Sequence, residues 1–248
     1  MSRIIAIANH KGGVGKTTTT ANVGACLSLQ GYRVLLIDLD AQANLTDYYL
    51  SKRPERTVYN ALTEESPLPI TEIGERLSIV PSSLEMLDIE NKIADNIDRA
   101  ELLQILIEPI KDKYDYILLD CPPSLGMLTV NAMAASDGVV IPMQCEFYAL
   151  EGLSQLMITV GRIKNHYNSA LTVTGILITM YNQRLLLSQQ VMSELRRHYA
   201  DKLLTPPISR SVKVSEAPGF GMPVYYHDKR NKGATEYLEC AKDLASRI

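Results

Sequence analysis

A glycine-rich segment near the start of the chain has the residue types that bind nucleotide phosphates. Residues 9–18 read Asn-His-Lys-Gly-Gly-Val-Gly-Lys-Thr-Thr. Glycines let the backbone point several N–H groups at phosphate oxygens, and a helix that begins there adds its free N–H groups. Lys16 can reach the terminal phosphates, and the Thr17 hydroxyl can coordinate the accompanying magnesium. The predicted phosphate loop comprises Gly12, Gly13, Val14, Gly15, Lys16, Thr17 and Thr18.

A glycine-rich turn without a ligand is the alternative interpretation of this segment. We favour phosphate binding because the glycines and the Lys-Thr pair occur together, between a predicted strand and a predicted helix. The loop departs from the general phosphate-loop pattern at one position, where His10 replaces the first glycine. Lys11 places an additional lysine in the loop.

Three carboxylates follow two other apolar runs. Asp38 and Asp40 come at the end of one run, and Asp120 ends the apolar residues 116–119. Ligands of open α/β sheets bind outside the carboxyl ends of the strands, so we expect these acids near the phosphate loop. We predict that Asp120 holds magnesium directly or through water, as in a Walker B strand, and that Asp38 belongs to the outer shell of the metal. Two acids capping a solvated loop are the alternative, which suits Asp38 better than Asp40.

Short apolar runs alternate with segments of helical period along the chain, which is typical of a parallel sheet covered by helices. The predicted strands are residues 3–9, 33–38, 77–80, 116–120, 138–142, 173–180 and 203–208. The predicted helices are residues 16–30, 99–111, 125–135, 150–166, 187–199 and 233–245. We therefore expect an α/β fold with a single doubly wound, mostly parallel sheet and helices on both faces. Gly31 is expected to end the first helix in the left-handed conformation.

The composition excludes several classes of protein. The 248 residues are 46% hydrophobic with a net charge of -3, which excludes a disordered chain. The four widely spaced cysteines contain no CxxC pair, so a disulfide scaffold, a zinc site and a redox pair are not indicated. The apolar N-terminal run is too short for a signal peptide, and residues 125–143 are too polar for a membrane span, so we predict a cytoplasmic protein.

Positive charge is concentrated in the last third of the chain. Residues 184–232 contain nine Lys or Arg against four Asp or Glu, a net charge of +5, while the remainder carries -8. Such an asymmetry is consistent with a surface that binds a polyanion. An ordinary solvated face is the alternative.

The octet Lys-Gly-Gly-Val-Gly-Lys-Thr-Thr at residues 11–18 resembles the deviant Walker A motif of the ParA/MinD family of ATPases. The resemblance implies that Lys11 contacts the phosphates of a partner subunit in a nucleotide-sandwich homodimer formed with ATP. A second cation beside the β and γ phosphates would neutralise charge that develops during hydrolysis. Lys11 and Lys16 are therefore candidate catalytic residues as well as nucleotide-binding residues.

Two further segments resemble the switch regions of the same family. Residues 35–44 resemble switch I, which implies that Asp40 orients the attacking water or acts as the general base, although the family usually has proline where this chain has Ala41. Residues 116–124, with their Pro-Pro turn, resemble switch II. An iron–sulfur role for Cys121, as in the related nitrogenase iron protein, is not indicated because the flanking segments do not resemble that protein.

The resemblance is to the short ParA/Soj branch of the family. Residues 144–153 and 215–221 resemble the corresponding ParA/Soj segments, so the likeness covers essentially the whole chain. The C-terminal residues 240–248 lack the basic amphipathic helix of a MinD-type membrane anchor, so we expect no membrane partner. The phosphate loop begins by residue 11, so we expect one ATPase domain over residues 1–248 without an N-terminal helix-turn-helix domain.

The resemblance also implies residues that bind DNA without sequence preference. The matching positions are Arg184 and Lys213, with Arg210 beside the latter, and all three lie in the positively charged third of the chain. Five other cations of that third, residues 196, 197, 229, 230 and 232, are interpreted as solvated surface and are secondary candidates at most. Ser209 and Ser211 occupy the loop that faces the adenine in relatives, where Pro-Arg-Asn is usual, and are expected to contact the base or the ribose.

We predict a slow ATPase that requires ATP and Mg²⁺, dimerises on ATP, binds non-specific DNA at the nucleoid and is stimulated by a ParB-type protein during chromosome or plasmid segregation. Two other functions stay open. One is a ParA-like ATPase that positions a protein cargo. The other is a metabolic P-loop enzyme that uses ATP for synthesis, such as the related dethiobiotin synthetases.

Overall fold

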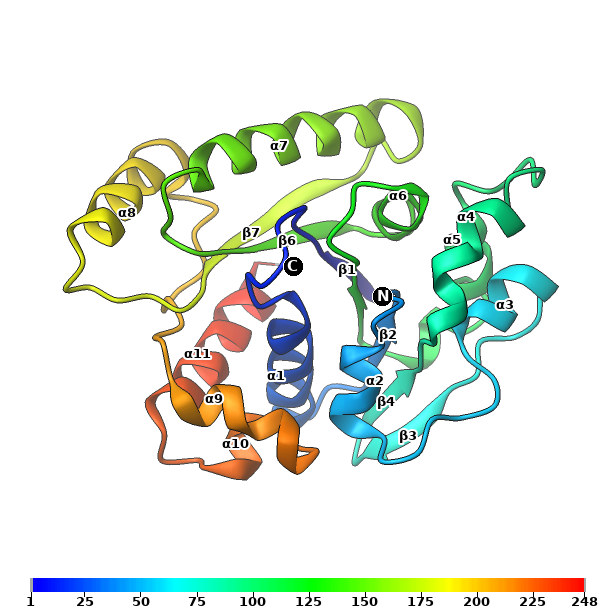
Figure 1. Cartoon of the computed structure of the whole chain (residues 1–248), viewed down its shortest axis with the longest axis horizontal. Coiled ribbons are helices and arrows are strands. Elements are labelled where there is room, and N and C mark those ends of the chain that lie inside the picture. Colours follow the sequence, from blue (N-terminus) through cyan, green and yellow to red (C-terminus); the bar gives the residue numbers. More distant parts are fainter. Residues whose placement is uncertain (1, 248) are drawn as a thin grey trace.

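The computed structural model describes residues 2–247, which form one seven-stranded sheet between two layers of helices (Figure 1). The strands lie in the order β3-β4-β2-β5-β1-β6-β7. All neighbours are parallel except β3 and β4. The strand bounds are β1 Arg3–Ile7, β2 Val34–Asp38, β3 Thr71–Gly74, β4 Leu77–Val80, β5 Tyr116–Asp120, β6 Gly138–Met143 and β7 Thr172–Ile178. The predicted doubly wound, mostly parallel sheet is confirmed.

Alternate residues of the central strands pack into two separate cores, one on each face of the sheet. In β1, Ile5 and Ile7 belong to one core, whereas Ala6 belongs to the other. Because both cores exclude water, the strands need apolar residues at every position, which explains their continuous apolar runs. The buried faces of the helices complete these cores.

One face of the sheet is covered by helices from both ends of the chain (Figure 1). They are α1 Lys16–Leu29, α2 Asn44–Tyr49, α9 Val212–Glu216, the 3-10 turn η3 Ala217–Phe220, α10 Val224–His227 and α11 Lys232–Ser246. The opposite face carries the helices of the middle of the chain. They are α3 Val58–Glu64, η1 Leu84–Asp88, α4 Ile89–Lys92, α5 Leu102–Ile107, η2 Lys111–Lys113, α6 Met127–Ala134, α7 Ala149–His166 and α8 Leu186–Tyr199.

Helix α1 is buried on most sides because it lies between the sheet and α11. A Cβ atom on Gly24 would lie 2.5 Å from Leu36 Cδ2, so glycine permits the close approach of α1 to β2. Gly31 has φ 94°, which confirms the predicted left-handed end of the helix. This packing fixes the start of α1 relative to the strand ends.

The predicted strand at residues 203–208 is wrong. This segment makes only isolated bridges, between Ile176 and Leu203 and between Tyr181 and Ser209. Pro206 and Pro207 have no N–H group to donate, so they interrupt the ladder that would extend the sheet beyond β7.

The remaining differences concern ends and short elements. Each of the other six predicted strands is present, with ends shifted by at most two residues. The helix predicted at residues 99–111 is reduced to α5, followed by the turn η2. The antiparallel β3 and the short helices between β2 and β5 and between β7 and α11 were not predicted. Within residues 2–247, no helix is long and apolar enough to cross a membrane.

Candidate functional site

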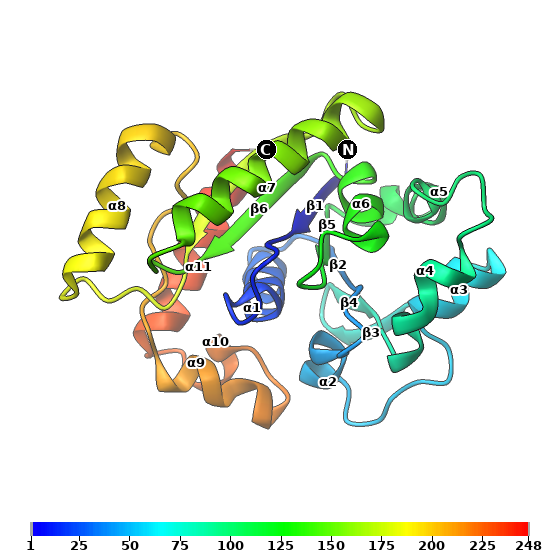
Figure 2. The same ribbon diagram turned by 45° about the horizontal axis from the view of Figure 1, so that its top comes forward.

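A cavity of about 440 Å³ lies where β1, β2 and β5 end and α1 begins. In Figure 2 the start of α1 lies between α2 on one side and the α9–α10 region on the other. The lining residues are Gly12, Gly13, Gly15, Lys16, Thr17, Thr18, Asp40, Gln42, Asn44, Tyr48, Pro123, Met180 and Pro218. The structure thus brings together most of the predicted phosphate loop and one of the predicted acids.

The backbone of the glycine loop has the form of an anion cradle. Gly13 and Gly15 have φ values of 73° and 87°, which L side chains rarely adopt. A Cβ atom at Gly12 or Gly13 would have no neighbour within 4 Å, so this side of the loop is open to a ligand. No side chain caps the start of α1, and its first N–H groups therefore remain available to phosphate oxygens.

Two side chains from distant segments hold the loop in place. Thr179 Oγ1 donates to the Val14 carbonyl at 2.8 Å, and Gln144 Nε2 donates to the Gly13 carbonyl at 2.8 Å. Both contacts give carbonyl oxygens of the loop a partner within the protein. Gln144 belongs to a segment that the family resemblance singled out, whereas no local pattern indicated Thr179.

Lys16 is only 7% exposed, yet it lines the cavity. Its ammonium group donates to the Lys11 carbonyl at 3.2 Å. Burial lowers the pKa of Lys16, and the negative charge of Asp120 opposes this shift. A buried ammonium with one neutral acceptor is a strong site for a polyanion, because a phosphate would supply the missing counter-charge.

Asp38 and Asp120 are neighbours in the register of β2 and β5. Asp38 Oδ2 accepts hydrogen bonds from Thr46 N at 2.9 Å and Thr46 Oγ1 at 2.7 Å, and Asp38 Oδ1 accepts from Asp40 N at 3.1 Å. Burial raises the pKa of both Asp38 and Asp120. Asp38 therefore ties the loop after β2 to α2, a role that the sequence did not indicate because Thr46 carries no recognisable signal.

Asp120 keeps one oxygen without a partner. Its Oδ1 accepts from Thr20 Oγ1 at 3.2 Å, but its buried Oδ2 has no hydrogen-bond partner. The hydroxyls of Thr17 and Thr20 partly offset the pKa rise that burial causes in Asp120. A buried carboxylate oxygen next to a threonine hydroxyl fits Mg²⁺, which takes one or two protein ligands together with phosphates and water. Thr17 and Asp120 are the residues that would hold it.

The Asp40 carboxylate has different surroundings from that of Asp38, because β2 ends at Asp38 and Asp40 belongs to the following loop. It lines the cavity, and its Oδ1 accepts from Gln42 N at 3.0 Å. Ser82 Oγ donates to the Asp40 carbonyl at 2.8 Å and fixes the backbone of this loop. Of these two acids, Asp40 is the one that lines the cavity beside the phosphate loop.

Lys11 differs from Lys16 in its surroundings. Its side chain is about half exposed and forms an ion pair with Glu146, in the segment between β6 and α7. The two lysines of one loop therefore point to different places, Lys16 into the cavity and Lys11 to the rim.

A second compartment of about 310 Å³ continues from the phosphate cavity and shares Gly15, Thr18, Met180 and Pro218 with it. Ser209 and Ser211, the predicted contacts of the base or the ribose, lie in its wall. Ser209 donates from its N and its Oγ to Glu236, both at 2.7 Å, and the Ser211 hydroxyl lies 3.0 Å from Asn231 Oδ1. The serines thus shape the wall, but both hydroxyls already have protein partners.

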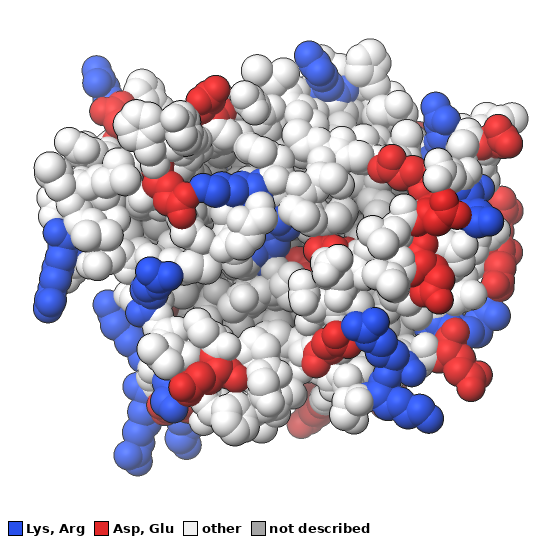
Figure 3. All heavy atoms as spheres, in the orientation of Figure 1, with Lys and Arg blue, Asp and Glu red and all other residues white. Residues whose placement is uncertain are grey.

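The three predicted DNA contacts are exposed. Arg184 precedes α8, and Arg210 and Lys213 lie at the start of α9. Lys213 also pairs with Glu216 at 2.9 Å. In Figure 3, blue Lys and Arg side chains follow the left edge from below α8 to the corner of α9 and α11, whereas on the right most of the red acidic side chains lie among further blue ones. The charge asymmetry of the sequence is thus also an asymmetry of this surface.

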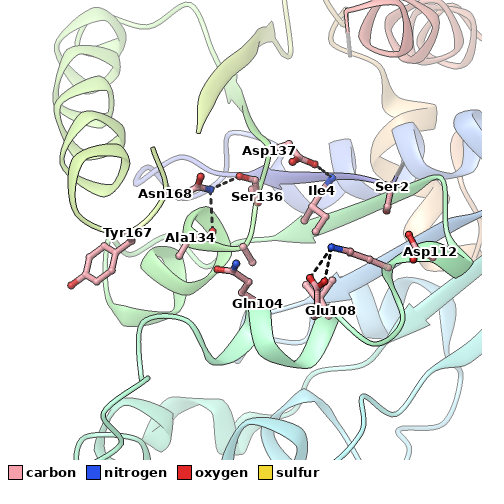
Figure 4. Close-up of a pocket in the computed structure, with 13 residues that line it drawn as sticks. Ser2, Ile4, Gln104, Glu108, Asp112, Ala134, Ser136, Asp137, Tyr167 and Asn168 are labelled. Carbon is pink, nitrogen blue, oxygen red and sulfur yellow. Dashed lines mark hydrogen bonds and ion pairs between the residues drawn. The ribbon is translucent and has the colours of Figure 1, made fainter. Parts of the chain in front are cut away.

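A further pocket of about 400 Å³ lies at the other end of the central strands, where β1 begins (Figure 4). Of its two amide side chains, Gln104 and Asn168, the latter donates from Nδ2 to the carbonyls of Met133, Ala134 and Ser136 at the end of α6. Its ammonium, from Lys111, pairs with Glu108. Asn168 and Lys111 thus already have protein partners, and this pocket contains none of the predicted phosphate or acid residues, so the phosphate cavity is the better candidate for the functional site.

The sequence resembles known proteins along its length. A family model described as an AAA domain matches residues 2–173. Over 252 aligned residues the chain is 44% identical to the sporulation initiation inhibitor protein Soj of Bacillus subtilis, with 99% of each chain covered. It is 43% identical over 252 aligned residues to the chromosome partitioning protein ParA of Caulobacter vibrioides, with 99% of this chain and 94% of ParA covered.

The fold also resembles a solved structure. A Mycobacterium smegmatis protein described as cobyrinic acid a,c-diamide synthase, crystallised with an ATP analogue and magnesium, matches with a TM-score of 0.86. It is 32% identical, and the match covers 98% of this chain and 93% of that protein. The fold described above is thus similar to that of a protein crystallised with an ATP analogue and magnesium.

Proposed function

We propose, from the premise that the chain belongs to the ParA/Soj family of AAA-domain partition ATPases, that ATP switches it between a monomer and a DNA-bound homodimer. The chain is an ATPase of this family, and its cofactor is Mg²⁺. We further propose that residues 1–248 act as one ATPase domain in the segregation of a chromosome or plasmid. The observation that carries the proposal is 44% identity to Soj over 99% of both chains.

The site supports ATP hydrolysis by its own residues. The glycine loop and the start of α1 bind the phosphates, and Lys16 supplies a buried positive charge. Thr17 and Asp120 hold Mg²⁺, which neutralises charge on the β and γ phosphates when it is bound. Asp40 orients water, and the second compartment takes the base and ribose.

Lys11 is the residue that we assign to the dimer. It lies at the rim of the cavity, where an exposed side chain can cross an interface, and its partner Glu146 lies at the same rim. An exposed ion pair contributes little free energy, so it can be exchanged for contacts with phosphates. Lys11 then acts on the nucleotide of the partner subunit.

Removal of Mg²⁺ tests the metal site. In EDTA we expect ATP hydrolysis to stop and ATP affinity to fall, because Asp120 then repels the phosphates without a cation between them. Asp120→Asn should lose hydrolysis in Mg²⁺, and EDTA should lower its ATP affinity much less than that of the wild type. ATP affinity measured by calorimetry decides the point. An Asp120→Asn protein as sensitive to EDTA as the wild type contradicts the assignment.

Arg184→Ala tests the DNA surface. Each phosphate contact contributes about 0.9 to the slope of log affinity against log salt, so two lost contacts in a dimer should reduce the slope by about 1.8. Fluorescence anisotropy with a random-sequence duplex at several salt concentrations measures this slope. We expect ATP-dependent dimerisation, measured by sedimentation, to be unchanged. Arg184 is exposed and lines neither the phosphate cavity nor the second compartment. Loss of dimerisation in Arg184→Ala contradicts a surface contact.

The experiment that tests the whole proposal compares binding to a random-sequence duplex with ATP, with ADP and without nucleotide, at two salt concentrations. We expect binding that requires ATP and falls steeply with salt. Association with the nucleoid follows from such binding, and a ParB-type protein is the expected stimulator of hydrolysis. A protein that binds no DNA in any nucleotide state overturns the proposal.

The fold similarity to the protein described as cobyrinic acid a,c-diamide synthase favours one alternative, an enzyme that uses ATP for amide synthesis. Its 32% identity is lower than the 44% and 43% identity to Soj and ParA. ATP hydrolysis that increases with DNA and a ParB-type protein favours partition, whereas amide formation from a corrinoid acid favours the alternative.

A further inference from the structure

A small polar pocket lies beside the base compartment, on the positively charged edge of the molecule. It has a volume of about 170 Å³ and is lined by Tyr181, Asn182, Gln183, Arg184, Ser209 and Lys232. A water molecule occupies about 30 Å³ in the liquid, so a pocket of this volume has room for one phosphate group with a few waters. The residues come from the loop after β7, the loop before α9 and the start of α11, so the pocket exists only in the folded chain.

The lining side chains are donors suited to an anion. Arg184 contributes a guanidinium group and Lys232 an ammonium group, which together recognise phosphate oxygens by charge and by hydrogen bonds. Asn182 Oδ1 accepts from Arg184 N at 3.1 Å, which orients the Asn182 side chain and leaves its NH₂ group as a donor.

A buried carboxylate holds Lys232 in the wall of the pocket. Lys232 Nζ lies 3.3 Å from Glu236 Oε1, one turn along α11, and the side chains of Lys232 and Glu236 are 74% and 9% exposed. Glu236 also accepts both hydrogen bonds from Ser209. Glu236 is therefore a positioning residue that connects Lys232 to the loop of Ser209, which lines both this pocket and the base compartment.

The charge balance of the pocket favours one phosphate. Two cations line it and one buried carboxylate lies behind it, so its net charge is positive, and the mostly exposed ammonium can turn from Glu236 towards an incoming anion. The interpretation of Lys232 as an ordinary solvated lysine does not explain why it shares a pocket with Arg184. Both cations belong to residues 184–232, which carry a net charge of +5.

We propose that this pocket binds one phosphodiester group of the DNA backbone, and that Lys232 is a DNA contact together with Arg184. The proposal rests on the proposed DNA-binding function and adds to it a defined seat for a phosphate. The duplex backbone, rather than a free phosphate ion, is the occupant because Ser209 of the pocket directly precedes Arg210 in the chain, and a duplex offers further phosphates to the exposed Arg210 and Lys213.

The test compares Lys232→Ala with Lys229→Ala, a matched control that removes an exposed cation from the same segment but outside the pocket. Affinity for a random-sequence duplex is measured with a non-hydrolysable ATP analogue and Mg²⁺ over a range of salt. For Lys232→Ala we expect the salt slope to fall by about 1.8 per dimer and the low-salt affinity to fall by more than about tenfold. Lys229→Ala should change both much less, and Lys232→Arg should restore binding.

The outcomes separate this proposal from the function on which it rests. If the wild type binds DNA with the ATP analogue but Lys232→Ala and Lys229→Ala bind equally well, the pocket is not a DNA site and the partition function stands. If the wild type binds no DNA, both proposals fail. In a further arm, inorganic phosphate is added at constant ionic strength. Phosphate that raises the melting temperature of the wild type but not of Lys232→Ala, with equal DNA affinities, identifies a free-phosphate site and overturns the proposal.

Discussion

Lys16→Ala is expected to lower ATP affinity by at least about 30-fold. Loss of one partner from a buried charged contact costs roughly 2–5 kcal/mol, and about 1.4 kcal/mol corresponds to a factor of ten. Lys16 is 7% exposed and lines the phosphate cavity. Lys11, the other lysine of the loop, does not line this cavity, so we expect no other cation of the loop to replace Lys16. Isothermal titration of the variant with ATP and Mg²⁺ measures the loss.

Lys11→Ala is the matched control for that variant, because it removes the other lysine of the same loop. Its side chain lies at the rim beside Glu146, so we expect it to bind ATP nearly as well as the wild type and to fail to dimerise. The apo form of Lys16→Ala should melt at the wild-type temperature or above it, since removal of a buried charge relieves a desolvation penalty. Unchanged ATP affinity in a folded Lys16→Ala protein contradicts the phosphate role of Lys16.

Asp40→Ala is expected to bind ATP normally and to accumulate as an ATP-bound dimer. General acid–base groups contribute typically 10²–10⁴-fold to a rate, so hydrolysis should fall by roughly 100-fold or more. The phosphate cradle is unaffected, because the glycine loop and Lys16 make no hydrogen bond to the Asp40 carboxylate among those that the structure describes. Sedimentation in ATP and a single-turnover assay measure the two effects.

Asp47→Ala is the control for Asp40→Ala. Asp47 is an exposed acid on the neighbouring helix α2 and pairs with Arg53 at 2.7 Å. We expect this variant to hydrolyse ATP at the wild-type rate. A monomeric Asp40→Ala protein with bound ATP, or one that hydrolyses ATP at the rate of Asp47→Ala, contradicts the water-orienting role.

The elements that carry the site were predictable because each depends on a short window of sequence. Strands β1 and β5 are continuous apolar runs, as burial on both faces requires. The glycine loop must follow a strand and precede a helix, so the position of Gly15 and Lys16 correctly predicted the first residue of α1. Parallel strands then bring Asp120 to the same edge as this loop without any further information.

The sequence was a poorer guide at the margins of the sheet. Residues 203–208 are apolar enough for a strand, but Pro206 and Pro207 leave only isolated bridges. The short helices α2, α9 and α10 have four to six residues, too few to show a helical period. Helices of that length are stabilised by tertiary packing rather than by their own sequence, so nothing local announces them.

What the sequence by itself determined was the kind of chemistry: a phosphate cradle, two lysines in one loop, and acids at the strand ends. Only the tertiary structure decided which of those groups remain free to act. Thr46 occupies an oxygen of Asp38, while Asp120 keeps Oδ2 unpaired. The Lys11–Glu146 contact joins residues 135 positions apart. Whether a polar atom is satisfied depends on neighbours in space, and residue type and spacing along the chain do not contain that information.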